Sequence, residues 1–484
     1  MGMTVDRRSF MGYFAGAGLS STLFPGVLWA KLAAGEEITV DTIASAEEVA
    51  GLHFDAAERE LMLDGLKQQE QRIEALHKVS LPNSVSPAII FDPRPPGKKI
   101  PNEPRRPMVR SKVAARTTSN NVDELAFLPV TELSELVRRK RVSATELTQM
   151  YLARLKKYDP VLRCVISFTE DRALKQARAA DEEIRRGHYR GPLHGIPWGA
   201  KDLLAVRGYK TTWGAGPFKE QVIDTDATVV QRLDEAGAIL VAKLTLGELA
   251  QGDIWFGATT KNPWKVDQGS SGSSAGPASA TAAGLVGFAI GSETLGSISS
   301  PSTRCGTTGL RPTFGRVPRT GAMALSWTMD KLGPICRSAE DCAIVLDAIY
   351  GPDGQDNSVI PASYHWNAKL SPKALRIGYV KSAFDSPQID PADASRTLHA
   401  TKKFDDAALD VFKRLGINLI AVDLPDVPYD AMRIILTAEA AASFDELTRS
   451  DRDRELVQQG KFDWQFLDNG IRMESSDPFT TPSA

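Results

Sequence analysis

A lysine lies within an apolar, glycine-bearing segment, "GPLHGIPWGAKDLLAV", where few charged residues are expected. Lys201 has Ile196, Trp198 and Leu203 as near neighbours in the sequence. If these surroundings bury the amine, its pKa falls from about 10.4 toward the range in which a neutral amine acts as a base. The segment alone leaves a second interpretation open, in which Lys201 forms a surface ion pair with Asp202.

The stretch "QGSSGSSAGPASATAAG", which runs from Gln268 to Gly284, places several serines among glycine and alanine residues. A flexible linker does not fit, because the chain continues directly into a dense apolar run. A phosphate-binding loop does not fit either, because the G-K-[ST] ending is absent. Small residues of this kind permit close backbone approach, as in a tight active-site turn or a closely packed helix.

Ser297 follows Gly296 in the segment "SETLGSISSPSTRCG". A serine that follows glycine on a tight turn is typical of a nucleophile, and the preceding backbone N–H groups can then hold an oxyanion. The six histidines form no H-x-x-x-H pattern and the four cysteines no C-x-x-C pair, so we expect neither a metal nor a cofactor. His194, beside the lysine segment, is interpreted as a packing residue.

Four segments, in this order, resemble the amidase signature family: "HGIPWGAKD", "GSSAGPASATAAG", "SETLGS" and "CGTTGLRPTFGRV". The resemblance spans roughly residues 122–450. It implies an α/β/α sandwich, in which helices cover a central mixed and twisted sheet, and a serine–serine–lysine triad. By position, Lys201 matches the triad lysine and Ser297 matches the nucleophile. The resemblance therefore implies an amidase, a hydrolase that acts on carbon–nitrogen bonds other than peptide bonds.

The bridging serine of this triad is the first of a serine pair, and the serine-rich stretch contains two such pairs. An ungapped alignment of "ASATAAG" with the alanine-rich run of the family puts Ser273 in the bridging position, at the spacing from Ser297 that the family shows. Ser270, Ser271 and Ser274 remain as alternatives.

In the mechanism that the resemblance implies, Ser297 Oγ attacks an amide or ester carbonyl while its proton passes through Ser273 to neutral Lys201. Lys201 later returns a proton to the leaving amine, and water hydrolyses the acyl-enzyme. The expected partner is a small-molecule amide substrate. The backbone N–H groups expected to hold the oxyanion are those of Thr294, Leu295 and Gly296.

This sequence departs from the family pattern near the nucleophile. Leu295 stands where a second glycine is usual, so its side chain is expected to narrow the oxyanion turn or to line the pocket. Ser299 stands where an arginine often follows, and Arg304 is a candidate for supplying that charge. The departures in the serine-rich stretch are Ser271, Ala275 and Pro277.

After "LRIGYV" the chain contains one helix–glycine–strand unit and one further helix before "MESSDPFTTPSA". Family members usually continue further, with more strands and more residues of the substrate pocket. We therefore expect the amidase signature domain, residues 121–484, to be incomplete at its C-terminus, which would leave an open sheet edge.

The first 34 residues are typical of an export signal. Arg7 and Arg8 precede an uncharged stretch from Met11 to Ala30, with small residues near its end. We expect a twin-arginine signal over residues 1–34 and a location in the periplasm or cell envelope. Two alternatives remain, an uncleaved membrane anchor and a cytoplasmic helix, because the uncharged stretch is just long enough to cross a bilayer.

The remaining sequence divides into an N-terminal extension and an α/β region. Residues 35–120 are expected to form an extension, helical at first and then rich in proline, that lies outside the reaction site. Beyond it, helices alternate with short apolar strands such as "AILVA" and "LRIGYV". This alternation predicts an α/β fold with a buried mixed sheet covered on both faces.

The charges nearly cancel, with 58 Lys and Arg against 60 Asp and Glu and a net charge of −2. No overall field therefore draws the chain to nucleic acid or to an anionic membrane. The four cysteines are interpreted as small buried residues, and a disulfide is the alternative if the protein is exported.

Three functions fit these observations. The first is an exported amide hydrolase. The second is the A subunit of a glutamine-dependent tRNA amidotransferase, which resembles the same family, although an export signal argues against work on cytoplasmic tRNA. The third is a binding protein that keeps the triad but is catalytically impaired.

Overall fold

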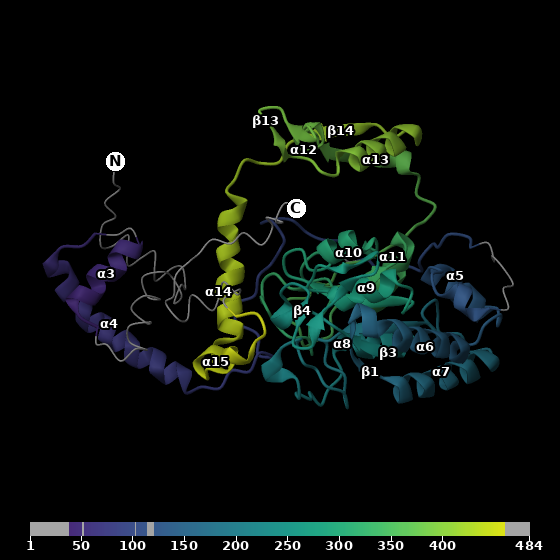
Figure 1. Ribbon diagram of the computed structural model, residues 1–484, viewed down its shortest axis with the longest axis horizontal. Coiled ribbons are helices and arrows are strands. Elements are labelled where there is room, and N and C mark those ends of the chain that lie inside the picture. The colour runs from purple at the N-terminus through teal and green to yellow at the C-terminus, as the bar shows by residue number, and fades with distance from the viewer. Residues whose placement is uncertain (1–37, 51–52, 102, 114–120, 460–484) are drawn as a thin grey trace. The chain divides into compact units, whose positions relative to one another are not determined.

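The computed structural model describes residues 38–50, 53–101, 103–113 and 121–459 (Figure 1). These residues form two compact units. The larger unit combines residues up to 103, residues 113–362 and residues from 434 onward. The smaller unit contains residues 104–112 and 363–433.

A six-stranded mixed sheet forms the centre of the larger unit. Its strands lie in the order β1, β3, β2, β8, β10, β9. Strand β2 pairs in parallel with β3 and β8, whereas β1, β10 and β9 pair antiparallel with their neighbours. The strands are β1 (Val165–Phe168), β2 (Pro197–Lys201), β3 (Ile239–Leu244), β8 (Phe288–Glu293), β9 (Thr308–Gly309) and β10 (Lys331–Cys336).

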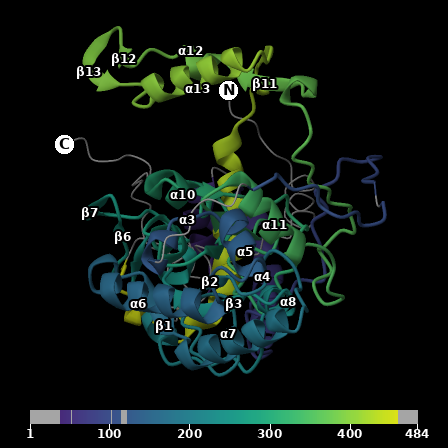
Figure 2. The ribbon, with the colours of Figure 1, turned by 90° about the vertical axis from the view of Figure 1, so that its right-hand side faces the viewer.

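The central strands of this sheet are covered on both faces. Every residue of β2, β3 and β8 is buried, and a strand is buried at successive positions only when both faces are packed. In Figures 1 and 2, α7 lies below β3, whereas α10 and α11 lie above it. The predicted α/β class, with helices on a central mixed sheet, is confirmed.

Seven of the described helices of the larger unit lie before, between and after the sheet strands in the chain, and α6 and α7 pack apolar side chains against the sheet. Leu152 and Leu155 of α6 form one core cluster with Ala173 and Ala177 of α7 and with Val241 of β3. These helices are α5 (Val130–Arg138), α6 (Ala144–Leu162), α7 (Glu170–Arg185), α8 (Thr228–Glu235), α9 (Ala275–Ala282), α10 (Ser299–Cys305) and α11 (Ala339–Ile349).

The small residues of the serine-rich stretch allow backbones to approach closely, as the sequence predicts. A Cβ atom on Gly272 would lie 1.7 Å from the carbonyl oxygen of Gly252. A Cβ atom on Gly276, in the first turn of α9, would lie 2.5 Å from the backbone nitrogen of Thr245. Because no side chain fits at either position, α9 can lie directly against the end of β3.

The N-terminal extension begins with two helices, α3 (Val40–Ala50) and α4 (Ala56–His77), and continues as an irregular proline-rich segment. The expected export signal, residues 1–34, lies outside the described residues. Within the ranges that the structure describes, no helix is both long and apolar enough to cross a membrane.

The smaller unit contains the strand–helix–strand pattern predicted from "LRIGYV" onward. Strand β11 (Ile377–Val380) pairs in parallel with β14 (Leu419–Val422), and helix α13 (Lys402–Arg414) connects them. A short helix, α12 (Lys381–Asp385), and a hairpin of β12 (Ile389–Asp390) and β13 (Asp393–Thr397) complete this unit.

The last described elements are α14 (Arg433–Ser443), α15 (Asp445–Arg449) and the 3₁₀ turn Arg452–Glu455. They belong to the larger unit, apart from the first residue of α14. The incomplete C-terminus stays a prediction. All four cysteines are buried and free, so the interpretation as small buried residues is confirmed over the disulfide.

Candidate active site

Lys201 is the last residue of β2, the strand between β3 and β8 in the middle of the sheet. Its side chain is fully buried. The amine Nζ donates hydrogen bonds to Ser273 Oγ and Ser292 Oγ, both at 2.8 Å, and to Ser274 Oγ at 3.1 Å. A small set of oxygens therefore surrounds the amine on a rigid strand end.

The environment of Lys201 favours the neutral amine. Burial lowers the pKa of Lys201 to about 7, although the carboxylates of Asp330 and Glu293 act in the opposite direction. A lysine with such a pKa is partly unprotonated near neutral pH and can accept a proton. The burial expected from the sequence is therefore present.

The alternative interpretation, a surface ion pair of Lys201 with Asp202, is wrong. The Asp202 carboxylate is buried and forms an ion pair with Lys243 Nζ at 2.7 Å. It also accepts a hydrogen bond from the Thr212 backbone N–H at 2.8 Å. Successive residues leave a strand end on opposite sides, so Asp202 and Lys201 belong to different buried clusters.

The structure separates the four candidate bridging serines into two groups. Ser270 Oγ donates to the carbonyl oxygen of Ser271 at 2.9 Å, and Ser271 Oγ lies 2.7 Å from Ser300 Oγ. Of the four, only Ser273 and Ser274 lie within hydrogen-bond distance of Lys201 Nζ in the described residues. Two of the sequence alternatives are therefore distant from the amine.

The hydrogen bonds of the remaining pair differ. Ser274 Oγ donates to the carbonyl oxygen of Ser292 at 3.0 Å and accepts from its backbone N–H at 3.2 Å. Ser273 Oγ has Lys201 Nζ as its one hydrogen-bond partner in the described part of the chain. Its hydroxyl proton is therefore free to be exchanged, which favours Ser273 over Ser274 as the bridging residue.

Ser297 lies on the turn between β8 and α10. Its side chain is 9% exposed, and its carbonyl oxygen accepts a hydrogen bond from the Ser274 backbone N–H at 3.0 Å. This bond links the turn to the serine pair that contacts Lys201. Gly296 has φ +92°, a backbone conformation that a side chain strains, so glycine is required before the nucleophile position.

A buried carboxylate, which the sequence reasoning missed, fixes this turn. Glu293 Oε2 accepts hydrogen bonds from the backbone N–H groups of Ile298 and Ser299, both at 2.8 Å. It also accepts one from Ser299 Oγ at 3.0 Å. Burial raises the pKa of Glu293, but these hydrogen bonds together outweigh it and lower the pKa overall, so a negative charge lies at the start of α10. The available signal was a glutamate directly after the apolar run "VGFAIGS".

Thr294, the first residue of the expected oxyanion turn, is hydrogen-bonded through both its side chain and its backbone. Thr294 Oγ1 donates to Asp330 Oδ1 at 2.5 Å, and the carbonyl oxygen of Thr294 accepts from Lys331 Nζ at 3.0 Å. The backbone N–H groups of this turn remain the predicted oxyanion donors.

His194 has the packing role that the sequence suggested. Its ring is buried, and Nδ1 accepts a hydrogen bond from the Arg190 backbone N–H at 3.1 Å. Burial lowers the pKa of His194. No group of three or more His, Cys, Asp or Glu side chains suited to a metal occurs among the described residues.

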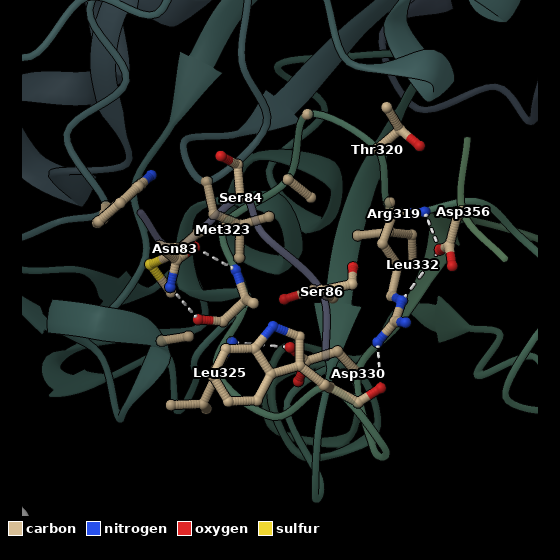
Figure 3. Close-up of a pocket in the computed structure, with 18 of the residues that line it drawn as sticks. Asn83, Ser84, Ser86, Arg319, Thr320, Met323, Leu325, Asp330, Leu332 and Asp356 are labelled. Carbon is tan, nitrogen blue, oxygen red and sulfur yellow. Dashed lines mark hydrogen bonds and ion pairs between the residues drawn. The ribbon is translucent and has the colours of Figure 1, made fainter. Parts of the chain in front are cut away.

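A cavity of about 600 Å³ lies beside these groups (Figure 3). Its lining includes Ser292, which contacts Lys201, and Thr294, which begins the expected oxyanion turn. Trp213, Met323 and Trp327 contribute apolar surface. The cavity therefore adjoins the lysine–serine cluster.

Comparison with known proteins decides the family. The chain matches the family model for amidases over residues 146–478. The chain belongs to the amidase signature family.

Two of the curated relatives are A subunits of glutamyl-tRNA(Gln) amidotransferase. The chain is 37% identical over 328 residues to the A subunit of glutamyl-tRNA(Gln) amidotransferase from Caldanaerobacter subterraneus, and the match covers 66% of this chain and 65% of that protein. It is 39% identical over 318 residues to the same component from Methylococcus capsulatus, with 64% of each protein covered. The chain thus spans somewhat less than two thirds of the length of these relatives.

Solved structures of amidase signature proteins share the fold. The peptide amidase of Stenotrophomonas maltophilia is 32% identical, with a TM-score of 0.61 over 74% of this chain and 78% of that chain. The A subunit of glutamyl-tRNA(Gln) amidotransferase from Thermotoga maritima is 26% identical, with a TM-score of 0.57 over 72% of this chain and 71% of that chain.

Leu295 and Ser299, which depart from the amidase signature pattern, and the candidate Arg304 lie on the turn before α10 or in α10 itself. Leu295 is 45% exposed and is not part of the cavity lining, so it does not line this cavity, and the expected narrowing of the oxyanion turn stays a prediction. Ser299 bonds to Glu293, as described above. Arg304 is exposed, whereas the guanidinium nearest to Glu293 is that of Arg311, with Nη1 3.5 Å from Oε1. The role of Arg304 as the source of that charge stays a prediction, and Arg311 is the arginine that forms an ion pair with Glu293.

Proposed function

We propose that this chain cleaves the carbon–nitrogen bond of an amide through a transient ester on Ser297, with Ser273 and Lys201 as the other members of the triad. The observation that carries the proposal is the buried Lys201 amine, with a pKa of about 7, at 2.8 Å from Ser273 Oγ. Membership of the amidase signature family supports an activity on carbon–nitrogen bonds.

The proposed reaction has two halves. Ser297 Oγ adds to the amide carbonyl, and its proton moves to Ser273, whose own proton moves to Lys201. The carbon–nitrogen bond then breaks, and the amine leaves with a proton returned along the same path. In the second half, water adds to the ester, and the carboxylic acid is released. The turn at Thr294, Leu295 and Gly296 would stabilise the oxyanion in both halves.

A second candidate is the A subunit of an amidotransferase, in which the released ammonia passes to an acceptor held with other subunits. The curated relatives, at 37% and 39% identity, support this candidate more directly than a free-standing amidase. Both candidates share the acylation of Ser297 and differ in what happens to the ammonia. A predicted export signal would favour the free-standing enzyme.

The two candidates are separated by ammonia release from the purified protein. A free-standing amidase releases ammonia from carboxamides without any other protein, and Ser297→Ala abolishes this release. A component of an amidotransferase releases ammonia from glutamine only when its partner proteins are added. The third candidate, an impaired binding protein, predicts no covalent adduct of Ser297 with a serine-reactive fluorophosphonate.

We also propose that residues 1–34 direct export to the periplasm or cell envelope. The twin arginines Arg7 and Arg8 and the uncharged stretch that follows support this location. N-terminal sequencing of the mature protein from cell fractions tests it. An intact Met1 on protein from the cytoplasmic fraction would contradict export.

A further inference from the structure

The N-terminal extension contributes a tight turn to the cavity beside the active site. The backbone N–H of Val85 donates to the carbonyl oxygen of Pro82 at 2.9 Å, which closes a β-turn with Asn83 and Ser84 at its tip. Pro82, Asn83, Ser84 and Ser86 all line the cavity. Figure 3 shows Asn83, Ser84 and Ser86 in the same cavity as labelled residues from the segment 319–356. A turn of the extension therefore lines the cavity that adjoins the lysine–serine cluster, which the sequence-based expectation did not include.

The Asn83 side chain joins the turn to the loop at Ala324, which also lines the cavity. Its side-chain nitrogen donates to the carbonyl oxygen of Ala324 at 2.7 Å, and its side-chain oxygen accepts from the backbone N–H of Ala324 at 2.8 Å. The same nitrogen lies 3.4 Å from the carbonyl oxygen of Ser443 in α14. The Asn83 amide thus pairs with the Ala324 backbone as one residue pairs with another in an antiparallel β-sheet. The turn, the loop at Ala324 and helix α14 are therefore all joined through Asn83.

The turn lines the cavity without filling it. The volume of about 600 Å³ exists with the turn in place, which is within the range of small-molecule sites. The same cavity reaches Ser292 and Thr294 beside the triad. An acyl group on Ser297 that extends past Thr294 into this cavity would contact the turn.

The three charged side chains of the described cavity lining all have partners within the protein, since Arg319 and Asp356 form an ion pair and Asp330 accepts hydrogen bonds. Arg319 forms an ion pair with Asp356 at 3.2 Å and donates to the carbonyl oxygen of Trp327 at 2.7 Å. Asp330 accepts from Thr294 Oγ1 and from the backbone N–H groups of Leu325 and Ser326, the latter two at 2.8 and 2.9 Å.

The rest of the described lining is uncharged. An anionic acyl group would lose its hydration here without gaining a free cationic partner, because Arg319 is paired with Asp356. An apolar acyl group would be stabilised by its burial.

We infer that the Pro82–Val85 turn is a specificity element of the active site, which limits the size of an uncharged, largely apolar acyl group, and that Asn83 holds it in place. This inference rests on the proposed acylation of Ser297. Loosening the turn then widens the acyl site, and enlarging its tip narrows the site.

The test uses three fluorophosphonates that bear an ethyl, a benzyl or a 3-carboxypropyl group, and it follows the rate at which each modifies Ser297 of the full chain by mass spectrometry. Ser297 Oγ displaces fluoride from phosphorus, so no amide substrate has to be known. The variants are Asn83→Ala, Ser84→Phe and, as a matched control, Ser80→Ala. Ser80 is exposed, lies in the same segment and is not part of the cavity lining. The thermal unfolding temperature of each variant is measured as well, so that a loss of folding can be told from a change in the modification rate.

The inference predicts opposite changes in the benzyl-to-ethyl rate ratio. Asn83→Ala raises the ratio by about fivefold or more, because two backbone groups of Ala324 lose their partner and the turn loosens. Ser84→Phe keeps both bonds of Asn83 and lowers the ratio by a similar factor. Ser80→Ala leaves it unchanged, and the wild-type protein reacts more slowly with the 3-carboxypropyl than with the benzyl compound.

Two results would overturn the inference. One is a ratio that stays the same in Asn83→Ala and Ser84→Phe while Ser297 is still modified, and the other is a faster reaction with the carboxylate compound. Wild-type protein that is not modified at all would instead contradict the proposed function, on which the inference depends.

Discussion

Lys201 Nζ lies 2.8 Å from Ser273 Oγ, and both side chains are buried. The lysine stands at the end of a central parallel strand, and the serine lies just before the helix α9. Burial brings the pKa of the amine to about 7, so a base is available without histidine. The same geometry leaves the Ser273 proton without another acceptor among the described residues, which is what a relay to Lys201 requires.

The pH dependence of the acylation rate follows from the pKa of Lys201. The neutral amine is the active form, so kcat/KM or the rate of fluorophosphonate modification is expected to rise about tenfold per pH unit below about 7 and to level off above it. Lys201→Arg, which keeps the charge at every pH, should be inactive throughout. A wild-type rate that is flat from about pH 5 to 9, or that falls as the pH rises, contradicts this role.

Ser273 and Ser274 are expected to respond differently to replacement by alanine. Ser273→Ala removes the proton relay and should lower kcat by about 100- to 10,000-fold with little change in unfolding temperature. Ser274→Ala removes two hydrogen bonds to Ser292 and should lower stability, with a smaller effect on kcat. Ser271→Ala serves as the control in the same stretch. Equal losses of kcat in Ser273→Ala and Ser271→Ala would rule out Ser273 as the relay.

The buried pair of Asp202 and Lys243 is expected to contribute to folding. Asp202→Asn leaves the Lys243 amine buried without its counter-charge and should lower the free energy of unfolding by about 3–5 kcal/mol. Glu220→Gln breaks the exposed pair with Lys210 and should change the free energy of unfolding far less, because water screens that pair. Urea unfolding measures both variants, and a cost for Asp202→Asn no larger than the control would show that the pair is not needed.

Glu293 is expected to act as a positioning residue for Ser297. Glu293→Gln weakens the bonds to the N–H groups of Ile298 and Ser299, and kcat should fall by about tenfold. The carboxylate also raises the pKa of Lys201, so its removal should move the midpoint of the pH profile downward. Glu124→Gln, an exposed control, should change neither value. A lower kcat with an unmoved or higher midpoint would leave Glu293 with a purely structural role.

Local sequence patterns predicted the α/β class, whereas the resemblance to the family supplied the roles of Lys201, Ser273 and Ser297. The structure places Ser273 Oγ within hydrogen-bond distance of Lys201 Nζ, and the role of Ser297 stays a prediction. The run "AILVA" overlaps β3 from Ile239 to Ala242, because a short apolar run is typical of a strand buried on both faces.

Contacts between distant segments could not be read from such patterns. The bond from Asn83 to Ala324 joins residues 241 positions apart, and nothing in the spacing of either segment indicates it. The pairing of Asp202 with Lys243, and the approach of Arg311 to Glu293, depend in the same way on how strands and turns pack. Side-chain direction at a strand end or turn, and not residue type, decided each case.

The most direct test of the account is the site and rate of fluorophosphonate modification in the full-length protein. Peptide mapping of the wild type should place one adduct on Ser297, and Ser297→Ala should carry none. Lys201→Ala should still form the adduct, but about 100- to 10,000-fold more slowly at pH 8, because the base is lost while the nucleophile remains. An adduct on another residue, or a Lys201→Ala rate equal to that of the wild type, would contradict the proposed triad.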